Sequence, residues 1–246
     1  MPHYAIALFE SAHRHIVAAE ADLQLHPLGD RWQVACLPLA DTDLEQFGRG
    51  EDRDPAWLAQ ALTRQHAAVS RMGAALPIYP LAFGTLLEDF AELEAAASAA
   101  APLLDAYFAQ VRGCGEWGLR IRATAEALEA PAPTHSGLAW LQHRRDAGRR
   151  RQEQRRERLE TALTLVAAHL DPVLRARTER PPSSGLAEDP QTLVNVALLA
   201  PFAEDERLEA ALQALDAALA PHGLSLRLSG PWAPYSFRPR LGEVAL

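Results

Sequence analysis

One long helical pattern, residues 137–170, constrains the fold of the second half of the chain. A helix of that length spans about 50 Å at 1.5 Å per residue, and Asp171-Pro172 ends it because the residue before a proline avoids helical geometry. Strand patterns lie on both sides. Trp117, Leu119 and Ile121 alternate with polar residues or glycine before it, as in a half-buried strand. These patterns predict an α+β fold.

The order of elements in this half predicts a second domain over residues 113–246. Strands are expected at 117–122, 173–178, 192–199 and 224–228, and a second helix around 208–219. The resulting order, β-α-β-β-α-β, is that of a ferredoxin-like unit. We therefore expect a C-terminal ferredoxin-like domain that carries the long helix.

The first half predicts a separate α+β domain over residues 1–112. Strands are expected at 3–9, 23–28, 31–39 and 76–83. Asp54 followed by Pro55 is typical of a helix start. Thr85 with Glu88 matches a capping box for a further helix. Gly113 and Gly115 end that helix and mark the boundary.

Charge and composition exclude some classes of function. The chain has 246 residues and a formal net charge of −8, which argues against general affinity for nucleic acid or an anionic membrane. All 24 basic residues are Arg, so lysine-based chemistry is ruled out. We expect no membrane span, because no run of about 18 apolar residues occurs. Cys36 and Cys114 are expected as free thiols of a reducing cytoplasm.

Two motifs resemble ligand sites without the context that such sites need. Residues 113–118 fit G-x-G-x-x-G, but nucleotide binding requires a strand before this motif and a helix after it. Here the order is reversed, which favours a helix-to-strand turn. His13 and His15 could bind a metal from a strand, although an exposed helix start is favoured. We expect no catalytic residues, cofactor or metal.

Residues 144–158 are unusually rich in arginine. Such a helix could dock an acidic partner protein or a phosphate backbone, or it could be a solvated helix face. No aromatic residue lies between the arginines, which disfavours single-stranded nucleic acid. The candidate protein-binding residues are Arg144, Arg145, Arg149, Arg150, Arg151 and Arg155.

Residues 230–237, Gly-Pro-Trp-Ala-Pro-Tyr-Ser-Phe, form what we call the aromatic segment. Two prolines exclude a regular central strand, and three aromatic side chains can each bury about 150–250 Å². We expect an extended clamp packed on the second domain. The alternative is a partner-facing edge, for which Trp232, Tyr235 and Phe237 are the candidate contacts.

The aromatic segment resembles the GPWPPYSF signature of the GvpF/GvpL family of gas vesicle proteins, with Ala233 in place of a proline. Residues 80–85 resemble the family's P-L-R-F-G-T, with Ala82 where Arg is common, so the role of that position stays open. Residues 116–121 resemble E-W-G-V-K-V. The matching residues are Pro80, Phe83, Gly84, Thr85, Glu116, Trp117, Gly118, Gly230, Pro231, Trp232, Pro234, Tyr235, Ser236 and Phe237.

The resemblance implies a cytoplasmic accessory or minor structural protein associated with gas vesicles. Its implied partners are the shell subunit and other gas vesicle accessory proteins, with no nucleic acid and no membrane. The family is described as two-domain, with ferredoxin-like elements and no known catalytic activity. The alternative is a small-molecule or nucleotide-binding enzyme on a ferredoxin-like scaffold, since fold alone does not fix function.

Overall fold

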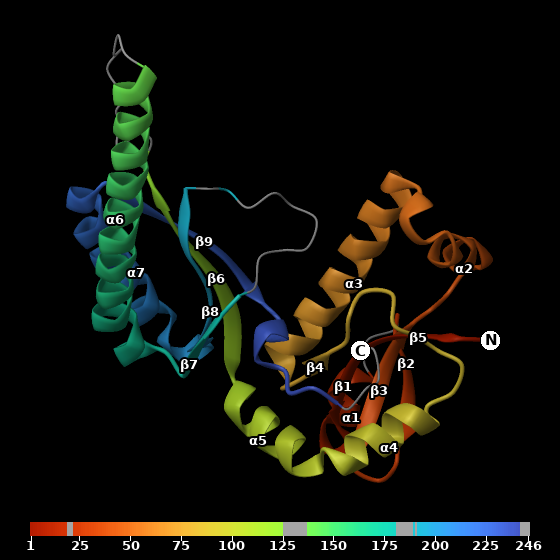
Figure 1. Ribbon diagram of the computed structural model, residues 1–246. Helices are drawn as coiled ribbons and strands as arrows, with labels where there is room; N and C mark the ends of the chain where they lie inside the picture. Colours follow the sequence, from red (N-terminus) through yellow and green to blue (C-terminus); the bar gives the residue numbers. More distant parts are fainter. Residues whose placement is uncertain (19–21, 125–136, 181–188, 190, 242–246) are drawn as a thin grey trace. The chain divides into compact units, whose positions relative to one another are not determined.

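The computed structural model describes residues 1–18, 22–124, 137–180, 189 and 191–241, without the side chains of 137–144 and 147. Contacts within the chain group into two compact units. The first unit holds residues 1–116 together with the segment from Pro231 onward, and the second holds Trp117–Gly230. Figure 1 shows the elements of both units, and each unit is described by itself below.

The first unit contains an antiparallel sheet of order β2-β3-β1-β4, with β5 also paired to β1. Its strands are β1 (His3–Glu10), β2 (Gln24–Leu28), β3 (Trp32–Leu37), β4 (Tyr79–Pro80) and β5 (Leu86–Leu87). The expected strands at 3–9, 23–28 and 31–39 are confirmed. The one expected at 76–83 shortens to two residues, because Pro77 and Pro80 have no amide hydrogen to donate to a ladder.

The helices of the first unit are α1 (Arg14–Val17), α2 (Asp41–Gly48), α3 (Pro55–Ala75), α4 (Ala91–Ala99) and α5 (Ala101–Val111). The expected start of α3 is confirmed, because the Asp54 side chain accepts a hydrogen bond from Ala56 N. The capping box at Thr85 is wrong. The Thr85 hydroxyl donates to Ala82 O, and Asp89 instead accepts from the first residue of α4, Ala91.

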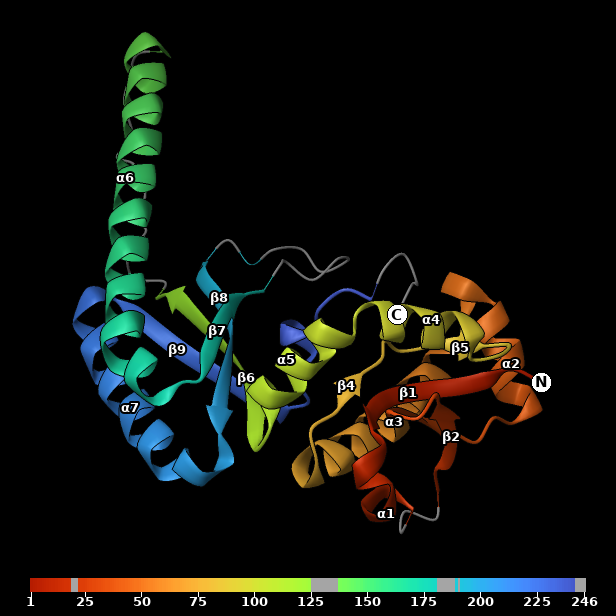
Figure 2. The ribbon, with the colours of Figure 1, turned by 90° about the horizontal axis from the view of Figure 1, so that it is seen from below.

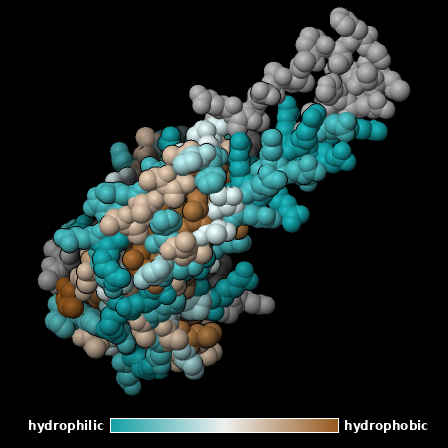
Figure 3. Space-filling model, turned by 90° about the vertical axis from the view of Figure 1, so that its left-hand side faces the viewer, coloured by the Kyte–Doolittle hydropathy of each residue, from teal (hydrophilic) through white to brown (hydrophobic). Residues whose placement is uncertain are grey.

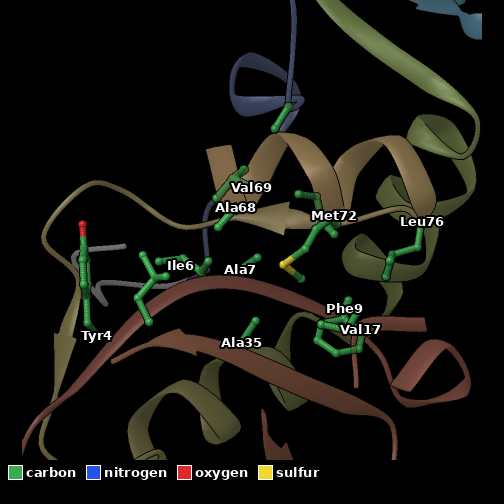
Figure 4. Packing of buried hydrophobic residues seen from close by; sticks show 13 residues of the cluster. Tyr4, Ile6, Ala7, Phe9, Val17, Ala35, Ala68, Val69, Met72 and Leu76 are labelled. Carbon is green, nitrogen blue, oxygen red and sulfur yellow. The ribbon is translucent and has the colours of Figure 1, made fainter. Parts of the chain in front are cut away.

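The core of the first unit lies between α3 and the sheet. In Figure 4, Val69 and Met72 of α3 face Ile6 and Phe9 of β1. All four side chains are buried. Truncation of a large buried side chain such as Phe9 to alanine costs about 3–5 kcal/mol, so this layer holds the sheet against α3.

The second unit follows the predicted β-α-β-β-α-β order, and the ferredoxin-like assignment stays our interpretation of it. Its elements are β6 (Cys114–Ala123), α6 (Gly137–Leu170), β7 (Ala176–Glu179), β8 (Thr192–Pro201), α7 (Asp205–Leu219) and β9 (Leu224–Trp232). The strand order in the sheet is β7-β8-β6-β9. Short 3-10 turns in the two units are Ser11–His13, Gly50–Asp52, Asp171–Val173, Phe202–Glu204, Ala220–His222 and Tyr235–Phe237.

Helices α6 and α7 cover one face of this sheet in both ribbon views (Figures 1 and 2). Ala162, Val166 and Leu170 of α6 are fully buried against the sheet and α7. Leu163 of the same helix is 42% exposed because it lies beside the contact face. The other half of α6 is a hydrophilic projection in Figure 3.

The aromatic segment departs from the prediction in its location. Strand β9 runs on to Trp232 at the edge of the sheet, where a proline is tolerated. Beyond that strand the chain packs in the first unit. Arg238 Nη1 donates to Pro80 O at 2.6 Å, and Tyr79 Oη donates to Pro239 O at 2.8 Å. The segment is therefore not a clamp on the second domain.

Candidate functional site

Parts of the three motif segments meet in the first unit, namely residues 80–85, Glu116 and residues 231–237. Residues 235–237 form a 3-10 turn, and Ala233 and Pro234 just before it are buried. Ala233 belongs to the core cluster of α3 and β1. Its Cβ would lie 3.9 Å from a Cβ added to Gly73 of α3, so a small residue on each side allows the close approach.

Glu116 holds the aromatic segment through its carboxylate. The side chain is 0% exposed. Ser236 donates to it twice, from the backbone amide to Oε2 and from the hydroxyl to Oε1, both at 2.7 Å. Hydrogen bonds to an ionised acceptor are among the stronger ones in proteins. The E-W-G motif and the aromatic segment are thus joined directly.

Tyr107 of α5 supports the same segment from inside. Its hydroxyl donates to Ile78 O at 2.9 Å and lies 3.3 Å from Pro234 O. A phenol has one proton, so the two carbonyl groups share it. Burial raises the pKa of Tyr107 well above its usual value, and the side chain therefore stays neutral.

Arg238 joins the aromatic segment to residues 80–85. Its guanidinium donates to Pro80 O at 2.6 Å and to Tyr235 O at 3.1 Å. The same group lies 5.6 Å from the Tyr79 ring centroid and 5.5 Å from that of Tyr235, within the range of cation–π attraction. One arginine thus bridges two motifs.

The loop at residues 82–85 depends on backbone geometry. Gly84 has a φ of +81°, and a Cβ there would lie 3.3 Å from the Phe47 ring. The amide and hydroxyl of Thr85 both donate to Ala82 O, at 3.3 and 2.9 Å. Ala82 therefore acts through its carbonyl, and its departure from the family pattern leaves these contacts intact.

Gln65 of α3 links β1 to both motifs through side-chain hydrogen bonds. Its Oε1 accepts from Tyr4 Oη at 2.5 Å, and its Nε2 donates to Leu81 O at 3.3 Å. Tyr235 also hydrogen bonds to Gln65, and burial raises the pKa of Tyr235. These groups form a buried polar network, which rigidifies a core when its members are satisfied.

The three aromatic candidates have different environments. Trp232 is 37% exposed, and its ring centroid lies 4.9 Å from that of His66 on α3. Leu62, one turn before His66, is 45% exposed. Tyr235 and Phe237 are partly buried. The segment is therefore anchored near Ala233 and Ser236, while Trp232 is the most exposed of the three aromatic side chains.

The arginine candidates lie on α6 of the second unit. Arg145, Arg149, Arg150 and Arg151 are exposed, and the Arg144 side chain lies outside the described residues. Arg155 is also exposed but donates to Thr192 O at 2.9 Å. The two candidate sets thus belong to different units and do not form one site within either.

Residues 113–118 follow a helix and lead through a turn at Gly113 into a strand, as expected. Helix α5 ends at Val111, Gly113 has a φ of +67°, and β6 begins at Cys114. Residues 114–123 form a strand, so no helix begins directly after the motif. The motif therefore lacks the helix N-terminus that binds phosphate. His13 and His15 lie in a 3-10 turn and in α1.

The described residues contain no cluster of three or more His, Cys, Asp or Glu that could hold a metal ion. No helix among them is long and apolar enough to cross a membrane. Cys36 and Cys114 are buried and form no disulfide, and burial raises the pKa of the Cys36 thiol to about 12.

Sequence reasoning missed Gln65, Tyr107 and Arg238, which hold the motifs together. Arg238 directly follows the aromatic segment and could have been included with it. The other two are polar groups on apolar helix faces. Such groups require a buried partner, and that signal was present in the sequence.

The chain matches a known family over nearly its whole length. The sequence model described as "Gas vesicle synthesis protein GvpL/GvpF" matches residues 4–239. The chain belongs to this family. Two relatives carry the name gas vesicle protein L. That of Haloferax mediterranei is 33% identical over 109 residues, which cover 44% of this chain and 34% of that protein. The protein from Streptomyces sp. is 28% identical over 212 residues, which cover 83% of this chain and 78% of that protein.

Two solved structures of GvpF proteins resemble this family member in fold. The crystal structure of GvpF from Anabaena sp. PCC7120 has a TM-score of 0.65, covering 96% of this chain and 97% of that one. The crystal structure of GvpF from Microcystis aeruginosa has a TM-score of 0.58, covering 96% of this chain and 98% of that one. Both are 12% identical to this chain. The likeness shows a shared α+β fold, while partners are not deduced from it.

Proposed function

We propose that this GvpF/GvpL family member is an accessory or minor structural protein that assists assembly of the gas vesicle shell by binding the shell subunit. Other gas vesicle accessory proteins are its further proposed partners. The observation that carries the proposal is the family match over residues 4–239. The motif segments support it, because they build a rigid scaffold from residues far apart in the sequence.

Two surfaces are suited to this role. Trp232 and Leu62 are exposed apolar groups on the first unit, and Trp is enriched at the energetic centres of protein interfaces. The exposed arginines of α6 offer a charged surface on the second unit. A subunit that builds a protein wall presents apolar faces and strand edges before assembly, which a bound accessory protein would cover.

The enzyme alternative drew on residues 113–118. Gly113 lies in a turn and residues 114–118 lie in β6, whereas a nucleotide site requires a following helix. Equilibrium titration with NAD, ATP and GTP separates the two functions. We expect no saturable binding at about millimolar concentration, and micromolar binding of any of them would favour the enzyme.

The assembly function is tested by deletion of the gene in its host. We expect electron microscopy to show few or no complete vesicles, and expression of the unaltered chain from a plasmid to restore them. A pull-down with purified shell subunit tests direct binding. Normal vesicles in the deletion strain, together with no capture of the subunit, would contradict the proposal.

A further inference from the structure

The sheet of the second unit has a second face, on the side opposite α6 and α7. On β6, Leu119 and Ile121 lie in the core with those helices, so Gly118, Arg120 and Arg122 point to the other side. On β9 the same alternation places Ser225, Arg227 and Ser229 on the face opposite the helices. We call this surface the basic sheet face; its residues are Gly118, Arg120, Arg122, Arg180, Ser225, Arg227 and Ser229.

Two arginines lie directly opposite one another at the centre of this face. Thr124 N donates to Gly223 O, and Ser229 Oγ donates to Gly118 O. Both contacts fit one antiparallel register, which places Arg120 opposite Arg227. Side chains so paired have Cβ atoms about 5 Å apart, and like charges there are destabilising. Both arginines are exposed, and among the described residues neither has an ion-pair partner.

Two further arginines lie on the same face. Arg122 Nε is 2.6 Å from an Asp189 carboxylate oxygen. The Arg180 guanidinium lies over Gly118, with Nη1 2.6 Å from the place of a Cβ on that glycine. Gly118 therefore leaves the space that the guanidinium occupies. Four of the seven residues that define the face are arginines, in a chain whose net charge is −8, and Asp189 pairs with one of them.

We propose that the basic sheet face binds a carboxylate-rich segment of a partner protein, with Arg120 and Arg227 as the central contacts. A carboxylate between the two guanidinium groups removes their repulsion and accepts paired hydrogen bonds. The hydroxyl of Ser225 can donate to the backbone of the bound segment. This inference goes beyond the proposed function, because it holds whether or not the partner is the shell subunit.

A peptide is favoured over a nucleic acid by the make-up of the face. None of its seven defining residues is aromatic, so bases have nothing on which to stack. A polyphosphate chain would also be repelled by the net charge of −8 over a longer contact. A short acidic segment, by contrast, would contact only the arginines of the basic sheet face.

The test uses a fluorescein-labelled peptide of about twelve residues in which Glu and Ser alternate. Anisotropy titration of the full chain at low salt should show saturable binding that weakens as salt is raised. R120E/R227E should weaken it about tenfold or more. The matched control R14E/R49E makes the same charge change at two exposed arginines of the first unit and should bind like the unaltered chain. R120Q/R227Q removes the charges without reversing them, so it should fold normally and also lose binding.

Several outcomes would overturn the proposal. If R120Q/R227Q has a normal melting curve and still binds the peptide, Arg120 and Arg227 are not the central contacts. Equal loss of binding in R14E/R49E would show that binding follows the net charge of the chain and not the basic sheet face. Equal binding of a Gln/Ser peptide excludes recognition of carboxylates, and tighter binding of oligothymidylate identifies a nucleic-acid surface.

Discussion

Ser236 donates from both its amide and its hydroxyl to the carboxylate of Glu116, a residue 120 positions earlier. A carboxylate is costly to bury unless donors satisfy it. At Glu116 two donors come from one residue of the aromatic segment, so undocking the segment would remove two hydrogen bonds from the buried carboxylate. The motif thus couples the segment to the end of the first unit.

Replacement of Ser236 by alanine should destabilise the first unit. The change removes one hydrogen bond to a buried charged group, and such bonds contribute about 1.5–3 kcal/mol. Urea unfolding followed by tryptophan fluorescence would measure the loss. The matched control is S98A, because Ser98 is exposed on α4. Equal midpoints for S236A and S98A would show that the Glu116 contact does not support the fold.

Trp232→Ala should cost little stability and reduce capture of the shell subunit. The side chain is 37% exposed, so we expect a loss of about 1 kcal/mol, below the 3–5 kcal/mol of a fully buried tryptophan. Melting and pull-down on one purified variant measure both effects.

The control for Trp232 is Tyr107→Phe, which removes the hydroxyl shared by Ile78 O and Pro234 O. It leaves buried carbonyl groups unsatisfied and should cost about 1–3 kcal/mol without altering the exposed surface. If W232A melts far below Y107F, Trp232 is mainly a packing residue. If W232A melts normally and still captures the subunit, its proposed binding role is wrong.

Much of the fold could be predicted from the sequence, because strong patterns decide it locally. The long helix at 137–170 and the cap at Asp54 are such cases. The location of the aromatic segment could not be predicted from the sequence, because it depends on the contact of Ser236 with Glu116, which lies far away in the chain. The capping box failed at Thr85 because the Ala82 carbonyl competes for its hydroxyl.

Asp43 should make the stability of the first unit depend on pH. Burial alone would raise the pKa of its carboxyl, but hydrogen bonds from Ala40 N, Trp57 and Arg64 outweigh burial and lower it. A carboxyl whose pKa is lower in the folded state stabilises the fold above its unfolded pKa, about 3.9. That stability is lost as the pH falls through the folded pKa.

Urea unfolding at several pH values from about 6 to about 3 would measure this dependence. D43N removes the titrating group and should be less stable than the unaltered chain at neutral pH. The gap between the two should narrow as the pH falls, because the protonated Asp43 also loses its charged contact with Arg64, 3.0 Å away. A constant gap would show that Asp43 acts through its neutral hydrogen bonds alone.

Reversal of Arg149, Arg150 and Arg151 to Glu should separate docking from folding on α6. All three side chains are exposed, and their one ion pair within the described part of the chain joins Arg149 Nη2 to Asp146 Oδ1 at 3.6 Å. Exposed pairs of this kind contribute about 0–1 kcal/mol, and the packing of α6 rests on the distant Ala162, Val166 and Leu170. The melting temperature should therefore change by only a few degrees.

If α6 docks an acidic partner, vesicle formation in the host should fall sharply, since the new carboxylates repel that partner. The matched control replaces the same residues with Gln, which removes the charge without repulsion and should give an intermediate defect. Normal vesicles with the Glu variant would leave this half of α6 as a solvated helix face.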